Sequence, residues 1–349
     1  MSVTRRALVL SALTVPALAA CSGGTSGSDT GSGSASDGGG AGSYPVTITH
    51  LYGDTEITAE PTSIATVSWV NGESVLALDI VPVGMPLVEW GGNDNGSTDW
   101  TDAKLEELGA AWGSDNAPAQ YSEADGLNVD EIAALTPDLI IAAYSGLTEE
   151  EYEQLTQIAP TIGPLAANYT AAWDEVLTVV GQATGRADQA EQLISDVQAQ
   201  QAAVGEDNPA VAESTFIAGT LGLSDNTISL YTAGDTRPRF FAALGMTQAE
   251  VVTENTEDES TFFMEWSAER ADELVSDIFY TWASAGDTVE DFEANDLFAQ
   301  VPAVADGGLV LTADDHLTLS VSAANVLSIP WAIENFVPDV IAAAETAQG

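Results

Sequence analysis

The segment that decides the fold is Leu139-Ile140-Ile141-Ala142-Ala143, five apolar residues in a row. An uninterrupted apolar run of this length is typical of a central strand in a parallel sheet, which is buried on both faces. A helix is expected before it at 129–135, where Pro137-Asp138 ends the helical pattern, and another after it at 149–158. This alternation of strand and helix predicts a parallel sheet with helices on both faces.

The same alternation extends on both sides of this segment, over 44–168. Strands are expected at 46–52, 64–67, 80–85 and 161–162, with a hairpin return at 55–58 and a helix at 73–79. The region 44–168 is therefore predicted to form one α/β lobe.

Residues 169–204 have a different pattern. Apolar residues recur at helical spacing from Trp173 to Val180 and again from Ala187 to Val197, and Gly185 separates the two runs. Two helices are predicted, the second over about 187–204. We interpret this segment as the connection between two lobes; the alternative is a surface helix of one larger domain.

Strand and helix signals start again in the region 205–349. Strands are expected at 214–218, 227–231, 278–282 and 309–312, and helices at 237–244, 267–275, 294–300, 322–329 and 333–344. The predicted fold class is therefore α/β, with two lobes joined by a helical segment. A ligand cleft is expected between the lobes, at the carboxyl ends of the strands.

Residues 1–20 have the features of a targeting segment. Arg5 and Arg6 precede an apolar stretch too short to span a bilayer, which ends in Leu18-Ala19-Ala20-Cys21. This ending looks like a bacterial lipobox and predicts lipidation of Cys21; the alternative is an ordinary signal peptide with a chance cysteine. The remainder of 21–43 is rich in Gly and Ser and predicts a flexible tether. The protein is expected on the extracytoplasmic face of the cell membrane, held by lipid.

The composition argues against several classes of function. The chain has 54 Asp+Glu against 7 Lys+Arg, a formal net charge of −47, which repels nucleic acid and anionic membrane surfaces. Two histidines and one cysteine leave too few ligands for a zinc or copper site, and one cysteine excludes an intrachain disulfide. No nucleophile elbow or phosphate-binding loop occurs, so the chain is not expected to be an enzyme. His50 is expected to be structural, and His316 to lie in a loop.

The residues that do suggest chemistry are arginines and aromatics. Arg237 and Arg239 flank Pro238 where the helix 237–244 is predicted to begin. In so acidic a chain they are either salt-bridge partners or ligand-binding groups, because guanidinium forks suit negative oxygens. Aromatic side chains at strand ends or in loops predict an apolar binding wall, although each alone is typical of packing. These aromatics are Trp69, Trp90, Trp100, Tyr144, Tyr231, Trp266 and Trp282.

Several segments, taken in their order, resemble one family. The lipobox and tether, the strand Val46-Thr47-Ile48-Thr49-His50, and the segments Asn128-Val129-Asp130-Glu131-Ile132 and Thr136-Pro137-Asp138-Leu139-Ile140-Ile141 resemble the iron-siderophore and cobalamin binding proteins of ABC importers. Segments 147–152, 158–161, 244–246 and 267–269 are similar to the siderophore branch. The resemblance covers about 44–345 and rests on the order of the segments.

This resemblance implies two three-layer lobes with mostly parallel sheets, joined by one long rigid helix. It implies a monomer that carries a ferric siderophore in its cleft to an ABC permease dimer with its ATPase. The siderophore, and no protein side chain, would hold the iron, and no cofactor is implied. Permease docking is implied through one acid per lobe: Glu269 in the second, and in the first Asp130, where glutamate is usual, or its neighbour Glu131.

The net charge also bears on the ligand. An acidic body repels a trianionic ferric catecholate, whereas a neutral or cationic ferric hydroxamate avoids this penalty, so a hydroxamate is favoured. Haem or cobalamin is the alternative within the same transporter class, with Tyr144, Tyr231 or His316 as candidate axial ligands of haem. A secreted, lipid-anchored hydrolase is the alternative from another class, and it would need a nucleophile with its base.

Overall fold

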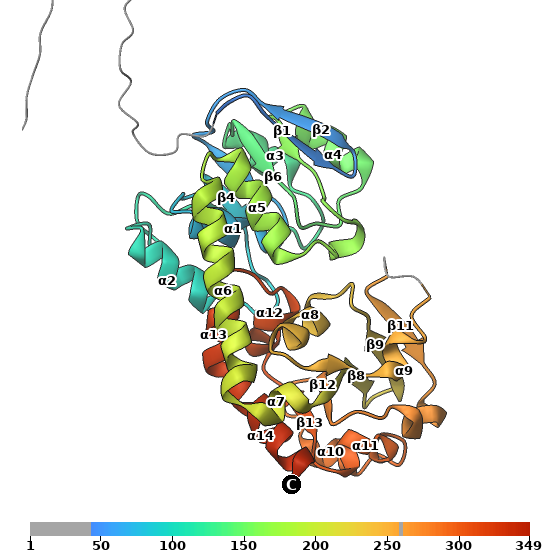
Figure 1. The fold of residues 1–349 in the computed structure, drawn as a ribbon. Helices are drawn as coiled ribbons and strands as arrows, with labels where there is room; N and C mark the ends of the chain where they lie inside the picture. The colour runs from blue at the N-terminus through green and yellow to red at the C-terminus, as the bar shows by residue number, and fades with distance from the viewer. Residues whose placement is uncertain (1–42, 258–260) are drawn as a thin grey trace, which may run out of the picture. The chain divides into compact units, whose positions relative to one another are not determined.

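The computed structural model describes residues 43–257 and 261–349 (Figure 1). The predicted signal peptide, Cys21 and nearly all of the predicted tether lie outside the described residues. Within the described ranges, no helix has both the length and the apolar character needed to cross a membrane.

The first lobe begins with a hairpin and continues as alternating strands and helices. Its strands are β1 (Val46–His50), β2 (Gly53–Ile57), β3 (Ile64–Thr66), β4 (Gly84–Pro86), β5 (Ala119–Tyr121), β6 (Leu139–Ile141) and β7 (Thr161–Ile162). Its helices are α1 (Asn71–Ala77), α2 (Asp99–Glu107), α3 (Val129–Ala134), α4 (Glu149–Thr156) and α5 (Trp173–Ala183), with a short 3₁₀ helix, η1 (Ala167–Tyr169).

The sheet of the first lobe is parallel, with strand order β5-β4-β3-β6-β7. The apolar run on β6 is buried on both faces, as its sequence predicts. Leu139 and Ile141 belong to the core cluster that contains α1 and α5, while Ile140 packs in a separate cluster with Ile132 of α3 and Leu155 of α4. Helices thus cover both faces, which makes this lobe three-layered.

A single long helix, α6 (Ala187–Asp207), leads from the first lobe to the second. Its 21 residues span about 30 Å at 1.5 Å per residue. At its start the Gln189 side-chain amide donates to the Asp79 carboxylate over 2.9 Å. Near its end Gly205 lies so close to Leu244 that an added Cβ would come 2.3 Å from that carbonyl oxygen. The helix is therefore fixed to both lobes.

The second lobe repeats the strand and helix alternation. Its strands are β8 (Thr215–Gly222), β9 (Thr227–Tyr231), β10 (Thr247–Gln248), β11 (Phe263–Trp266), β12 (Ile278–Trp282) and β13 (Leu309–Thr312). Its helices are α7 (Pro209–Glu213), α8 (Thr236–Ala243), α9 (Glu250–Thr253), α10 (Val289–Glu293), α11 (Pro302–Ala305), α12 (Asp315–Ser322), α13 (Ser328–Asn335) and α14 (Val337–Gln348), with the 3₁₀ helices η2 (Ala268–Glu273) and η3 (Phe298–Gln300).

The sheet of this lobe is mixed, with strand order β11-β9-β8-β12-β13. Strands β8, β12 and β13 are parallel to each other, β10 pairs with β8 in parallel, and β9 and β11 are antiparallel additions. Ile278 and Tyr280 of β12 face one core cluster and Phe279 faces another, so this sheet is also covered on both sides.

The same hydrogen-bonding arrangement of an aspartate occurs at the start of a central strand in each lobe. The Asp138 carboxylate, just before β6, accepts hydrogen bonds from the backbone of Thr62 and Ser63, just before β3. The Asp277 carboxylate, just before β12, accepts from the backbone and hydroxyl of Thr215 at the start of β8. Each aspartate therefore joins the amino ends of neighbouring strands, and the two lobes are alike in construction.

Two predicted helices are wrong for the same physical reason. The expected helix 294–300 is instead a turn after α10 followed by η3, because the Asn295 side chain accepts from the backbone of Leu297 and Phe298. The expected helix 322–329 is a break between α12 and α13, where Asn325 accepts from Leu327 and Ser328. Asparagine side chains compete in this way with the helical hydrogen-bond ladder.

Other boundaries also differ from the expectation. The segment 267–275 forms the 3₁₀ helix η2 with a break at Arg270 rather than an α-helix, and the helix expected at 333–344 divides at Phe336 into α13 and α14. His316 lies in the first turn of α12 and not in a loop, because Asp314 caps this helix. The helix near 237 starts one residue earlier, with Asp235 as its cap.

Candidate ligand-binding site

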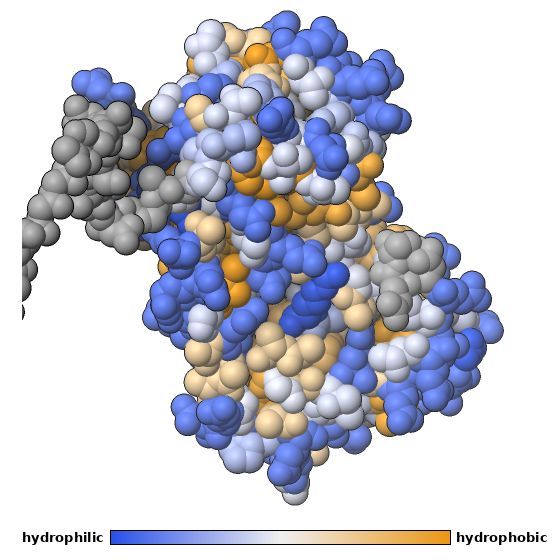
Figure 2. Space-filling view, turned by 45° about the horizontal axis from the view of Figure 1, so that its top comes forward, coloured by the Kyte–Doolittle hydropathy of each residue, from blue (hydrophilic) through white to orange (hydrophobic). Residues whose placement is uncertain are grey.

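A pocket of about 640 Å³ is lined by side chains of both lobes. From the first lobe come Ser68, Trp69, Pro86, Leu87, Glu89, Trp90, Glu123, Tyr144, Asn168 and Tyr169, and from the second Asp235, Arg237, Phe262, Trp282 and Ser322. Most of these residues end or follow β3, β4, β5, β6 and β12, so the carboxyl ends of the strands build the site. In Figure 2 a band of apolar surface runs across the region between the lobes.

Arg237 enters this pocket as part of a buried ion pair. Its Nε and Nη2 donate to the two carboxylate oxygens of Asp235 over 2.7 and 2.6 Å, and Asp235 also accepts from the Arg237 backbone. Below the guanidinium lies the Tyr231 ring, with its centroid 3.4 Å from Cζ. Burial disfavours the charged guanidinium, but the Asp235 carboxylate outweighs it and raises the pKa of Arg237. Arg237 is thus both an ion-pair partner and a pocket residue.

A second carboxylate in the pocket, that of Glu123, has no such cation in the part of the chain that the structure describes. Glu123 accepts hydrogen bonds from the Ser68 backbone N–H over 3.1 and 3.4 Å. Burial, helped by the charges of Glu89 and Glu151, raises the pKa of Glu123 to about 7. Glu89 is exposed and accepts from the Ser122 hydroxyl over 2.7 Å.

Aromatic rings form much of the remaining wall. Trp90 of the first lobe meets Trp282 of the second edge-on, with ring centroids 6.1 Å apart. Tyr169 contacts both Tyr144 and Trp69, at 5.7 and 6.4 Å. The Trp282 indole N–H donates to the Tyr231 hydroxyl over 3.0 Å, which orients the ring that borders the pocket.

The lining contains five of the arginine and aromatic side chains predicted from the sequence: Trp69, Trp90, Tyr144, Arg237 and Trp282. Tyr231 lies behind them, under Arg237. Arg239 instead donates to the backbone carbonyls of Thr170 and Ala233, and Trp266 packs in the core of the second lobe with its indole N–H on the Arg270 carbonyl. Ligand contact by Arg239 or Trp266 stays a prediction of the sequence.

Sequence reasoning missed the acids of the pocket. Asp235 has a local signal, because an acid two residues before Arg237 at a helix start is typical of a cap. Glu123 has only its position two residues after β5, and Glu89 has only its position three residues after β4. Among 54 acidic residues neither position is distinctive.

The acids predicted to dock on a permease are exposed and do not line this pocket. Asp130 and Glu131 occupy the first turn of α3, where the Asn128 side chain accepts from the Glu131 backbone. Glu269 occupies the first turn of η2. Each lobe therefore presents an acidic helix start to solvent.

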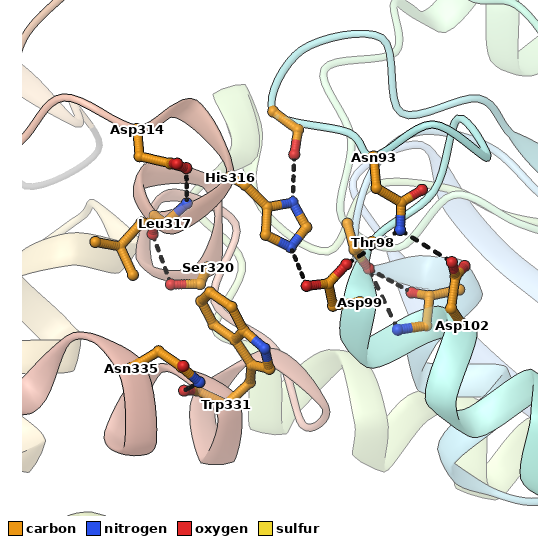
Figure 3. A network of polar contacts seen from close by, with 12 residues as sticks. Asn93, Thr98, Asp99, Asp102, Asp314, His316, Leu317, Ser320, Trp331 and Asn335 are labelled. Carbon is orange, nitrogen blue, oxygen red and sulfur yellow. Dashed lines mark hydrogen bonds and ion pairs between the residues drawn. The ribbon is translucent and has the colours of Figure 1, made fainter. Parts of the chain in front are cut away.

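Both histidines have structural surroundings. His50 is buried beside the Thr55 hydroxyl, 3.0 Å from Nε2, which confirms its expected role. His316 joins the lobes (Figure 3): Nδ1 lies 2.6 Å from the Gly91 carbonyl oxygen and Nε2 lies 3.6 Å from the Asp99 carboxylate. Trp100 and Trp331 pack against the same imidazole, with centroids 4.9 and 5.3 Å away.

Comparison with known proteins agrees with this architecture. The family described as periplasmic binding protein matches residues 64–315. No match was found among curated proteins. The iron uptake ABC transporter substrate-binding protein PiaA from Streptococcus pneumoniae TIGR4 is 26% identical, with a TM-score of 0.76 over 86% of this chain and 100% of that one. PiaA in complex with ferrichrome gives 27% identity and a TM-score of 0.77 over 86% and 99%.

A more distant structure has the same fold. Staphylococcus aureus SirA complexed with staphyloferrin B is 20% identical, with a TM-score of 0.66 over 84% of this chain and 98% of that one. The family match covers more than half of the chain, and the pocket lies between its two lobes. The chain is therefore a member of the periplasmic binding protein family, and it is a solute-binding protein rather than an enzyme.

Proposed function

We propose that this protein is a lipid-anchored, extracytoplasmic substrate-binding protein that captures a ferric siderophore and delivers it to the permease dimer of an ABC importer. The observation that carries the proposal is the interlobe pocket with aromatic walls and one guanidinium. Its volume of about 640 Å³ is in the range of small-molecule sites. Asp235 accepts hydrogen bonds from Nε and Nη2 of Arg237. No acceptor among the described residues uses Nη1, so this nitrogen is available to donate to a ligand oxygen.

The proposed ligand is a ferric hydroxamate. Ferrichrome, the ligand of the PiaA complex, is a neutral chelate of this class. The pocket contains Glu89 and Glu123 besides the Asp235–Arg237 pair, so a strongly anionic chelate would enter against two uncompensated carboxylates. A neutral or cationic chelate avoids this repulsion and still contacts the indole rings.

Tryptophan fluorescence tests the ligand class. Ferrichrome is expected to quench the emission of the protein and to bind with a Kd of about 1 μM or lower, as a pocket of this size allows. The panel includes ferric enterobactin, haem and cobalamin, each titrated under the same conditions. Binding of haem or cobalamin with ferrichrome inactive would replace the proposed ligand, and binding of none would remove the proposed function.

The docking acids are tested by separating ligand binding from uptake. Removing Asp130, Glu131 and Glu269 together by substitution with alanine should leave ferrichrome affinity unchanged, because none lines the pocket. Whole-cell uptake of ⁵⁵Fe-ferrichrome should fall at least tenfold, since exposed charges govern partner recognition and association. Glu150→Ala, an exposed acid in the first turn of α4, is the matched control. Uptake at the normal rate in the triple variant would leave these acids with a helix-end role only.

The lipid anchor is tested at Cys21. Cys21→Ala removes the only thiol that a lipid could modify. The variant is expected to appear in the soluble or secreted fraction, or to remain unprocessed, while the Ser22→Ala control stays in the membrane fraction. A Cys21→Ala protein of mature size that remains in the membrane fraction would contradict the anchor.

A further inference from the structure

The pocket has an unbalanced charge. Its lining contains three carboxylates, Glu89, Glu123 and Asp235, and one cationic side chain, Arg237. Arg237 neutralises Asp235, because both carboxylate oxygens accept from its guanidinium. The two side chains are 8% and 13% exposed, in the order Asp235 and Arg237. The remaining charge in the lining is therefore that of Glu89 and Glu123.

Glu123 is the more buried of these two acids, and it has no counterion within residues 43–257 and 261–349. Its contact in the described chain is the Ser68 backbone N–H, and none of the ion pairs found there includes Glu123 or Glu89. A carboxylate held in a partly dry site without a cation is costly, since burial disfavours its charged form. A cation supplied by the ligand would relieve this cost.

The aromatic walls of the same pocket also suit a cation. Trp69 and Tyr169 are half-exposed large aromatics in the same lining, with their rings 6.4 Å apart. Aromatic faces attract ammonium groups, and a carboxylate beside them adds a charge-assisted hydrogen bond. The aromatic wall and the uncompensated carboxylate are independent features of one cavity, and both favour the same ligand group.

We propose that Glu123, supported by Glu89, binds a protonated amine of the ligand, so that the protein prefers ferric trihydroxamates that carry a pendant ammonium over neutral chelates with the same iron centre. This inference rests on the proposed function and names a specificity residue within it. The ammonium would lie against the Glu123 carboxylate, with the iron chelate toward the indole rings and Arg237.

Two ligands that differ in one charge test the inference. Ferrioxamine B has a pendant ammonium, and its N-acetyl derivative has the same iron chelate without that charge. At pH 8 the wild-type protein should bind ferrioxamine B about 10-fold to 100-fold more tightly, the value of one charged hydrogen bond. Titrations in 0.5 M NaCl separate the local contact from long-range attraction by the net charge, which salt screens.

Substitutions and the pH dependence of binding identify the side chain responsible for the preference. Glu123→Gln keeps an oxygen for the Ser68 N–H and should lose most of the preference, and Glu89→Gln should lose part of it. Glu150→Gln, at an exposed acid of α4 outside the lining, should keep it. Burial, together with the charges of Glu89 and Glu151, raises the pKa of Glu123 to about 7. The preference should therefore decline from pH 8 to pH 5.5 in the wild type and not in Glu123→Gln.

The possible results separate this inference from the proposed function. Equal binding of both ferrioxamines by the wild type would overturn the ammonium site and leave the ferric hydroxamate function intact. A preference unchanged in Glu123→Gln would also overturn it, by assigning the selectivity to another group. Failure of both ligands, and of ferrichrome, to bind would refute the proposed function itself.

Discussion

Arg237→Ala is expected to lower the free energy of unfolding by about 3–5 kcal/mol, because it leaves a buried carboxylate without its cation. Asp235 is 6% exposed, and both of its oxygens are bound by the Arg237 side chain. Its bond to the Arg237 backbone survives the substitution but does not neutralise the charge. Urea denaturation at pH 8 measures the loss.

Two control variants accompany Arg237→Ala: one on the same helix, and one that removes both members of the ion pair. Arg239→Ala removes two hydrogen bonds to backbone carbonyls and no ion pair, so its expected cost is nearer to about 1–2 kcal/mol. The double variant Asp235→Ala, Arg237→Ala should recover much of the stability lost in Arg237→Ala, since no charge is then left unpaired. A single variant as stable as the wild type would mean that water compensates Asp235 in the pocket.

The stability of the protein is expected to fall by about 3 kcal/mol, from Glu123 alone, as the pH rises from about 4.5 to about 7. The folded state raises the pKa of this carboxyl, so over that interval the folded chain holds a proton that the unfolded chain releases. The contribution is complete below pH 4.5 and is lost as the pH passes 7. Glu73, buried on α1 with its pKa also raised by burial, acts in the same direction.

Glu123→Gln isolates this effect from the general repulsion of an acidic chain. The variant should be more stable than the wild type at pH 8 and about equal to it near pH 4.5, as measured by thermal unfolding. Glu131→Gln, with the same change of net charge at an exposed position, gives the background. Identical pH profiles for Glu123→Gln and Glu131→Gln would show that the Glu123 carboxyl is solvated in the folded protein.

The elements that local pattern determines were the ones predicted well. The strands at 227–231, 278–282 and 309–312 have the expected bounds. The last two begin with continuous apolar runs, as strands buried on both faces do, and 227–231 alternates polar and apolar residues before Tyr231. The helix expected at 187–204 extends to Asp207, as apolar spacing locates a helix better than its end. The helices predicted at 294–300 and 322–329 are interrupted because the side chains of Asn295 and Asn325 bond to the backbone in place of helical carbonyls. The sequence does not show which asparagines form such bonds.

The site was predicted less completely, for a reason that concerns burial. Aromatic residues at strand ends are rare enough to stand out, so Trp69, Trp90 and Trp282 could be chosen from the sequence. An acid in a pocket looks like any acid on the surface, and Glu123 differs from its neighbours only through the loops that enclose it. Arg239 was predicted to share the role of Arg237 because the two are close in sequence. Residues two apart on a helix lie on different faces, and the Arg239 side chain donates to the Thr170 carbonyl of the first lobe instead.

Helix α6 has a consequence for the modularity of the protein. Its buried residues are divided between partners, with α5 of the first lobe on one side and α8 and α13 of the second on the other. Val197 and Val204 belong to a single core cluster that continues through both lobes. A chain cut at either end of α6 would leave one half with an uncovered apolar stripe, which favours aggregation over folding. We therefore expect that neither lobe can be expressed alone, and that neither can be exchanged between relatives as an independent domain.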